Sequence, residues 1–114
     1  MSRDAIVAGT GFANSNGTSR AAIVRRHCRP GDCALLVREP NNPYDKDAIA
    51  VFVSVPRFFG LFGRCNAQIG YIKAGTAGSL AKKLDSGVRV VATVKNMYAP
   101  EGTDHPRVTL HLEY

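Results

Sequence analysis

The sequence contains no tryptophan, only three cysteines and no long run of apolar residues. No stretch approaches the roughly 18 apolar residues of a membrane-spanning helix, and the N-terminal residues lack the apolar centre of a secretory signal peptide. The odd number and irregular spacing of Cys28, Cys33 and Cys65 are typical of reduced thiols rather than of disulfides. We therefore expect a cytoplasmic protein without a membrane segment.

Acidic residues are also scarce. Nine Asp and Glu stand against 15 Lys and Arg, which gives the chain a formal charge of +6. Such a balance favours polyanionic partners, nucleic acid among them. Many basic domains use the same charge only for solubility, so charge alone leaves both interpretations open.

The motifs of nucleotide, nucleophilic and metal chemistry are incomplete. Gly9-Thr10-Gly11 resembles the start of a dinucleotide-binding fingerprint, but Asn14 replaces the third glycine and no βαβ pattern follows. No phosphate-binding Gly-Lys-Ser/Thr loop occurs, and no residue has the local context of an activated nucleophile. The candidate zinc ligands are His27, Cys28, Cys33 and Cys65, but they lack the paired CxxC spacing of zinc sites. We predict no enzymatic activity, no metal, no cofactor and no small-molecule substrate.

Strand patterns dominate the chain, and 45% hydrophobic content over 114 residues indicates one folded domain, residues 1–114. The pattern predicts six strands, at residues 5–12, 34–38, 48–53, 68–72, 88–95 and 108–113. Two short helices are expected, from residue 18 or 19 to 28 and over 76–85. These elements predict a mainly β fold, a small six-stranded barrel with two helices.

The first expected helix carries Arg25, Arg26 and Arg29 on the side opposite to its apolar residues. They form either a solvated face or a basic track for DNA. Residues 55–64 fit the strand pattern poorly, because Phe58, Phe59 and Phe62 are unusual in a solvated loop. These rings either fold back onto the barrel or form an exposed patch for a partner or for unpaired bases.

Residues 39–47 contain two prolines, two asparagines and two aspartates, which excludes a helix interior. This composition predicts a sharply turned loop that holds Tyr44 and Asp45 beside the strand at 48–53. Two interpretations are open. The loop recognises a ligand, or its turn residues only bond their own backbone while Tyr44 closes the end of the barrel.

Three segments carry a resemblance to a known family: residues 7–12, residues 37–51 with Arg38-Glu39-Pro40-Asn41-Asn42-Pro43-Tyr44-Asp45, and Gln68-Ile69-Gly70-Tyr71-Ile72. Together with the second helix they resemble a HIRAN domain over nearly the whole chain. The resemblance implies a six-stranded barrel related to oligonucleotide-binding (OB) and SH3-like folds. It also implies a DNA-binding module, which in the best understood members grips the 3′-hydroxyl end of single-stranded DNA in repair or replication-fork processing.

The resemblance implies roles for individual residues. Tyr44 and Asp45 match the aromatic residue that contacts the terminal nucleotide and the carboxylate that accepts a hydrogen bond from the free 3′-hydroxyl. Asn42 would hold the loop or contact the sugar, and Phe12 matches a stacking aromatic at the end of the first strand. Lys46 and Lys73 would contact phosphates.

Two positions depart from the family pattern. Gly11 stands where end-binding members carry a basic residue, and Asn96-Met97-Tyr98 stands where they offer a phenylalanine. Tyr98 is therefore expected as the second stacking face. Strand alternation favours a core position for Tyr71 over contact with a ligand.

Two functions follow from these observations. The first is non-catalytic recognition of a DNA 3′ end by the residues named above. The second is a protein-interaction module that docks a helicase or nuclease through its basic surface and phenylalanine-rich segment, with DNA contacted only by that partner.

Overall fold

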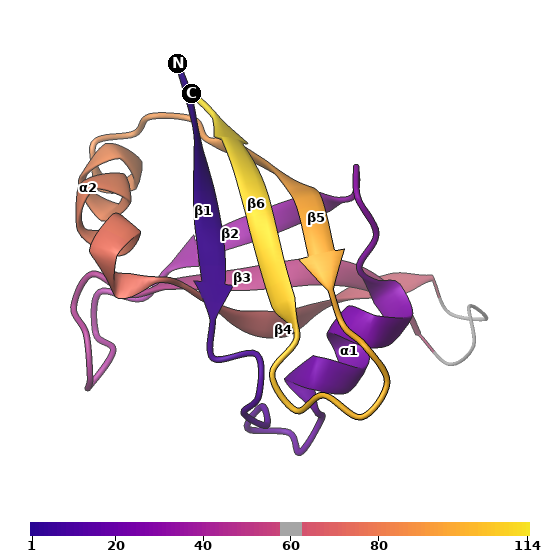
Figure 1. The fold of residues 1–114 in the computed structure, drawn as a ribbon. Helices are drawn as coiled ribbons and strands as arrows, with labels where there is room; N and C mark the ends of the chain where they lie inside the picture. The colour runs from indigo at the N-terminus through magenta and orange to yellow at the C-terminus, as the bar shows by residue number, and fades with distance from the viewer. Residues whose placement is uncertain (58–62) are drawn as a thin grey trace.

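The computed structural model describes residues 1–57 and 63–114, so the segment with Phe58, Phe59 and Phe62 lies outside the described residues. Figure 1 shows the arrangement of the elements. The described residues form six strands and two helices: β1 (Ser2–Ala8), α1 (Arg20–His27), β2 (Cys33–Arg38), β3 (Ile49–Pro56), β4 (Arg64–Ile72), α2 (Ala74–Asp85), β5 (Val91–Tyr98) and β6 (Arg107–Glu113).

The strands close into a barrel in the order β1-β4-β3-β2-β5-β6, and every neighbouring pair is antiparallel. The barrel closes where β6 pairs with β1, in a register that runs from Ser2↔Glu113 to Ile6↔Thr109. Two of the pairings that complete the closure are short, because β1–β4 and β2–β5 are joined by two residue pairs each. The predicted mainly β barrel with two helices is confirmed.

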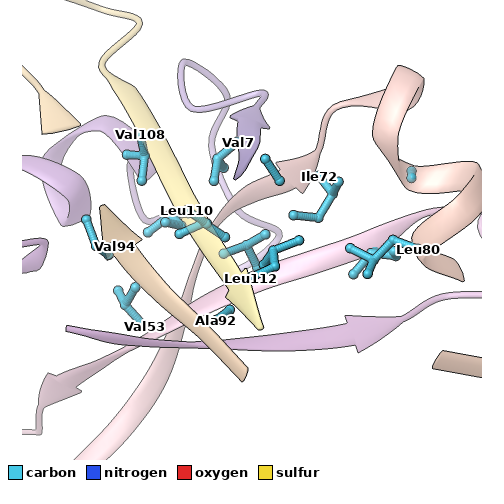
Figure 2. Packing of buried hydrophobic residues seen from close by; sticks show 14 of the residues in the cluster. Val7, Val53, Ile72, Leu80, Ala92, Val94, Val108, Leu110 and Leu112 are labelled. Atoms are coloured by element: carbon cyan, nitrogen blue, oxygen red, sulfur yellow. The ribbon is translucent and has the colours of Figure 1, made fainter. Parts of the chain in front are cut away.

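The inward faces of the strands fill the barrel with aliphatic side chains. The alternation predicted for β6 is confirmed, because Val108, Leu110 and Leu112 are fully buried while their neighbours are not. Figure 2 shows these side chains meeting those of β1, β3, β4 and β5, with Leu80 reaching in from α2. A rigid barrel of this kind presents its loops in fixed positions.

The two helices lie on different sides of the barrel (Figure 1). Helix α1 begins after Ser19, which is its N-cap residue: the Ser19 hydroxyl accepts a hydrogen bond from the backbone N–H of Ala22. This start agrees with the predicted start of the helix at residue 18 or 19. Helix α2 starts at Ala74 rather than at the predicted residue 76, and it buries Ala77, Leu80 and Ala81. Neither helix combines the length and the apolar character needed to cross a membrane within the described part of the chain.

The prediction of a first strand over residues 5–12 was wrong at both ends. Strand β1 starts at Ser2 and stops at Ala8, because Gly9 adopts a positive φ of 75° that turns the chain out of the sheet. The backbone N–H of Phe12 donates to the carbonyl of Gly9 (3.2 Å), which places Phe12 in a turn rather than in a strand. Strand β5 likewise begins at Val91, later than the predicted residue 88.

Candidate nucleic-acid interface

One asparagine shapes the loop between β2 and β3. The Oδ1 atom of Asn42 accepts hydrogen bonds from the backbone N–H groups of Tyr44 (2.9 Å) and Asp45 (3.1 Å). Its Nδ2 atom donates to Oε1 of Glu39 (3.0 Å). Because both ends of its amide are engaged in this way, Asn42 holds the loop, one of the two roles expected for it.

Asp45 is only partly engaged by the same loop. Its Oδ1 atom accepts a hydrogen bond from the backbone N–H of Asp47 (2.9 Å), and its carbonyl accepts one from Ala48 (3.1 Å). Among the described residues, no donor reaches the other carboxylate oxygen, Oδ2. The half-buried carboxylate is therefore held in place with one oxygen available to a ligand.

A cavity of about 710 Å³ lies between this loop, the turn after β1, the end of β4 and the start of α2. Its volume is in the range of sites that hold small organic ligands or cofactors. Four of the predicted site residues line it together: Phe12, Asn42, Tyr44 and Asp45. The structure thus brings Phe12 close to three loop residues that lie thirty or more positions later in the sequence.

Two aromatic residues at the cavity are exposed to solvent. Phe12 is 69% exposed and Tyr44 is 96% exposed. The barrel end is therefore not closed by Tyr44, contrary to one of the two interpretations of the loop. An exposed aromatic ring at a cavity is suited to stacking on a flat ligand.

Tyr71 also lines the cavity, and the prediction of a core position for it was wrong. Its neighbour Ile72 points into the barrel, so alternation along β4 turns Tyr71 outward. There it is half-buried, and its hydroxyl donates to Oε1 of Glu39 (2.9 Å). The sequence did not single out Glu39 either, although it is the first residue of the loop between β2 and β3, residues 39–48, which we refer to as the recognition loop.

Arg20 supplies the positive charge of the cavity. Its guanidinium carbon lies 5.5 Å from the centroid of the Tyr71 ring, a cation–π contact. The Nε atom donates to Oδ1 of Asn14 (2.8 Å), and Nη1 donates to the carbonyl of Gly9 (3.1 Å). Among the described residues that line the cavity, Arg20 is the only lysine or arginine. No sequence signal separated it from the other arginines of the first helix.

Comparison with known proteins identifies the family of the chain. The family model of the HIRAN domain matches residues 7–113, which is nearly the whole chain. The chain belongs to the HIRAN family. HIRAN domains are DNA-binding modules. No curated protein sequence matches the chain.

Two solved structures are similar to this HIRAN domain. The crystal structure of the HIRAN domain of human HLTF superposes with a TM-score of 0.64 at 24% identity, over 97% of this chain and 72% of that chain. The crystal structure of a protein from Lactobacillus plantarum superposes with a TM-score of 0.67 at 26% identity, over 97% of this chain and 92% of that chain. The first likeness shows the shared fold.

The remaining predicted site residues of this HIRAN domain lie around or away from the cavity. Lys46 is exposed on the recognition loop but does not line the cavity. Lys73 is exposed at the N-cap of α2, between two residues that do line it. Tyr98 is 66% exposed and lines a separate cavity beside Arg107, so the structure does not bring it to the other site residues.

The loop between β5 and β6 explains why this HIRAN domain has glycine at position 11. A Cβ atom added at Gly11 would lie 2.8 Å from the carbonyl oxygen of Asp104 and closer still to the ring of His105. The Asp104 carbonyl and the exposed imidazole of His105 therefore occupy the space that the Cβ atom of any other residue at position 11 would need. The departure from the family pattern has a steric cause.

The outward basic face expected on the first helix is present in part, because Arg26 and Arg29 are exposed. Arg29 lies just beyond α1 and donates from Nη1 to the carbonyls of Arg25 (3.1 Å) and Cys28 (2.7 Å). Arg25 is half-buried, and its Nη2 atom donates to the carbonyl of Thr103 (2.7 Å), so this arginine helps to hold the loop between β5 and β6.

The cysteines of this HIRAN domain occupy different environments. Cys33 and Cys65 are exposed, whereas Cys28, the C-cap residue of α1, is buried, and all three are free thiols. Burial raises the pKa of the Cys28 thiol to about 11. Within residues 1–57 and 63–114, no group of three or more His, Cys, Asp or Glu is placed to hold a metal ion.

Proposed function

We propose that this HIRAN domain binds single-stranded DNA at its free 3′-hydroxyl end, without catalysis, as a module of DNA repair or replication-fork processing. The observation that carries the proposal is the shared cavity of Tyr44 and Asp45, with one oxygen of the carboxylate uncommitted. Membership of the HIRAN family supports DNA as the class of ligand. The cavity would provide the selectivity for a strand end.

The terminal base would stack on the exposed rings. Phe12 comes from the turn after β1 and Tyr44 from the recognition loop, so they approach the cavity from two different segments. Base stacking on a protein aromatic contributes about 1–3 kcal/mol per base and tolerates any base. The rings therefore provide affinity without sequence preference.

The Asp45 carboxylate would select the end of the strand. Its free Oδ2 can accept a hydrogen bond from a 3′-hydroxyl, which is a neutral donor. A 3′-phosphate, or the phosphate of a continuing strand, would instead place negative charge next to negative charge. Ends that carry a hydroxyl are favoured over both alternatives.

Positive groups around the cavity would contact the phosphates. Arg20 lines the cavity, Lys73 caps α2 beside it, and Lys46 lies on the same loop as Asp45. Ala74, the first residue of α2, also lines the cavity, so the positive end of the helix dipole adds to this field.

Binding of two labelled oligonucleotides that differ only in a 3′-hydroxyl or a 3′-phosphate tests the proposal. The wild-type protein should bind the hydroxyl form at least about tenfold more tightly, since one charge-assisted hydrogen bond contributes about 1.5–3 kcal/mol. The Asp45→Ala variant should lose this preference. Glu101→Ala removes an equal charge from an exposed residue outside the cavity and should keep it. Equal affinities of the wild type for both ends would refute end recognition.

A docking module for a helicase or nuclease is the alternative function. Leu35 and Val37 favour it, because they lie 48% and 38% exposed on the outer face of β2. The response to salt separates the two functions. Affinity for DNA falls steeply as counterions compete for phosphates, whereas apolar docking hardly responds.

A further inference from the structure

A second cavity, of about 430 Å³, lies between the segment before α1 and the outer faces of β3 and β4. Among the described residues that line it, there is no lysine, arginine, aspartate or glutamate. Half-buried Phe52 lines it together with four residues that carry side-chain amides, Asn14, Asn16, Asn66 and Gln68. We refer to this cavity as the amide groove.

The amides of the groove keep hydrogen-bonding groups free. Gln68 donates from Nε2 to the carbonyl of Gly70 (3.2 Å), which leaves its Oε1 without a donor among the described residues. Asn16 accepts from Thr18 at Oδ1 and leaves its Nδ2 free, and the Asn66 side chain makes no hydrogen bond within the same part of the chain. The groove thus offers both donors and acceptors beside an aromatic ring.

The amide groove and the first cavity share one wall. Asn14 lines the groove, and it accepts a hydrogen bond from Arg20, which lines the first cavity. The same asparagine donates from Nδ2 to the carbonyl of Gln68 (3.0 Å). Along β4, Gln68 and Tyr71 are three residues apart, about 10 Å. About three stacked nucleotides of one strand cover that distance.

We propose that the amide groove is a second DNA subsite, which takes a base about three nucleotides before the 3′ end held in the first cavity. The inference rests on the proposed function, because the strand enters the groove from that cavity. A groove whose described lining holds no lysine or arginine does not favour a phosphate, whereas a base has a flat face for Phe52 and an edge of donors and acceptors for the amides.

Length dependence of binding tests the subsite. A dinucleotide with a 3′-hydroxyl should bind the Asn66→Ala/Gln68→Ala double variant as tightly as the wild type. An oligonucleotide of about eight nucleotides should bind the double variant about fivefold to thirtyfold more weakly, the effect of two lost hydrogen bonds. Asn96→Ala, which removes an exposed amide outside both cavities, is the matched control and should bind both ligands normally.

A scan with single abasic nucleotides locates the subsite. In the wild type, one abasic position near the third nucleotide from the 3′ end should weaken binding, and the double variant should not respond to it. Unchanged affinity of the double variant for the longer strand, with Asp45→Ala still impaired, would overturn the subsite alone. An equal loss for the dinucleotide and the longer strand would overturn it too. Loss of any preference for a 3′-hydroxyl in the wild type would overturn the proposed function instead.

Discussion

The hydroxyl of Tyr71 donates a hydrogen bond of 2.9 Å to Oε1 of Glu39, and this bond joins β4 to the recognition loop. The same oxygen accepts a hydrogen bond from Nδ2 of Asn42 (3.0 Å). One carboxylate oxygen therefore connects the barrel wall to the residue that shapes the loop. We expect Glu39 to be a positioning residue, because it holds Asn42 and Tyr71, which both line the first cavity.

Replacement of Glu39 tests this connection. Glu39→Ala removes the acceptor for both donors and should weaken binding of 3′-hydroxyl DNA about fivefold or more, since each hydrogen bond contributes about 0.5–1.5 kcal/mol. Glu39→Gln keeps an amide oxygen that can accept both bonds and should bind nearly as the wild type does. Fluorescence anisotropy with one labelled strand measures both variants. Equal impairment of the two variants would show that charge, not hydrogen bonding, matters at this position.

Arg20 is expected to be the most sensitive arginine of α1. Its two hydrogen bonds and its contact with the Tyr71 ring are lost in Arg20→Ala, so affinity for DNA should fall about tenfold or more. Arg26→Ala removes the same charge from an exposed position of the same helix. It should lower affinity only slightly at physiological salt. Similar losses in both variants would contradict the assignment of Arg20 to the site.

Lys73 is expected to contribute to the salt dependence of binding. For single-stranded DNA, loss of one phosphate contact lowers the slope of log affinity against log salt concentration by about 0.7. Lys73→Ala and Lys46→Ala should each show this change across DNA sequences. Lys82→Ala, on the exposed side of α2 and outside the first cavity, is the control with the same loss of charge. If the slope of either lysine variant equals the wild-type slope, that lysine does not contact a phosphate.

The thiols should differ in reactivity. Burial raises the pKa of Cys28 to about 11, so almost no thiolate exists there at neutral pH, whereas Cys33 and Cys65 are exposed. A thiol reagent should therefore modify two cysteines of the native protein quickly and the third only after unfolding. Mass spectrometry after a short reaction identifies the modified positions. Rapid modification of Cys28 in the native protein would contradict its burial.

The free energy of unfolding should depend on pH through the ion pair between β2 and α2. The Arg38 guanidinium donates to both carboxylate oxygens of Asp85 (2.9 and 3.1 Å), which lowers the pKa of Asp85 below its ordinary value of 3.8. A lowered pKa stabilises the fold above the pKa of the unfolded chain, and this contribution is lost as pH falls through the folded value.

Urea unfolding as a function of pH measures that contribution. Asp85→Asn should lower the free energy of unfolding at neutral pH, and its difference from the wild type should shrink as pH falls below 3.8. Asp104→Asn changes an exposed carboxylate that forms no ion pair with a described residue and should show a much smaller difference. A deficit of Asp85→Asn that is the same at every pH would exclude the ion pair as its cause.

The sequence predicted the elements of the fold because their signals are local. Alternation of Val108, Leu110 and Leu112 predicts a strand with one buried face, and the confirmed pattern of β6 follows directly from it. Strand ends were less predictable. The end of β1 at Ala8 depends on the positive φ of Gly9, which periodicity does not report.

Composition marked the site in one segment, and the family resemblance added Phe12 from another, which lines the same cavity. Tyr44, Asp45 and Asn42 lie in a single loop whose composition marks it, and the structure places them at one cavity. Arg20 and Tyr71 escaped prediction because each joins the site through contacts with residues far away in the sequence. Alternation predicted a core position for Tyr71, but the β3–β4 register shifts opposite Gln68 and Gly70, and the structure places Tyr71 on the outer face of β4.

Asn42 has a consequence for the kinetics of recognition. Since its amide fixes the backbone at Tyr44 and Asp45 before any ligand arrives, the loop needs no ordering step when DNA binds. The backbone of the loop should then superpose closely in the free and bound states, and only the exposed side chain of Tyr44 should change its conformation on binding. Under the proposed function, binding of a strand end would then proceed at a rate set by diffusion and charge rather than by rearrangement.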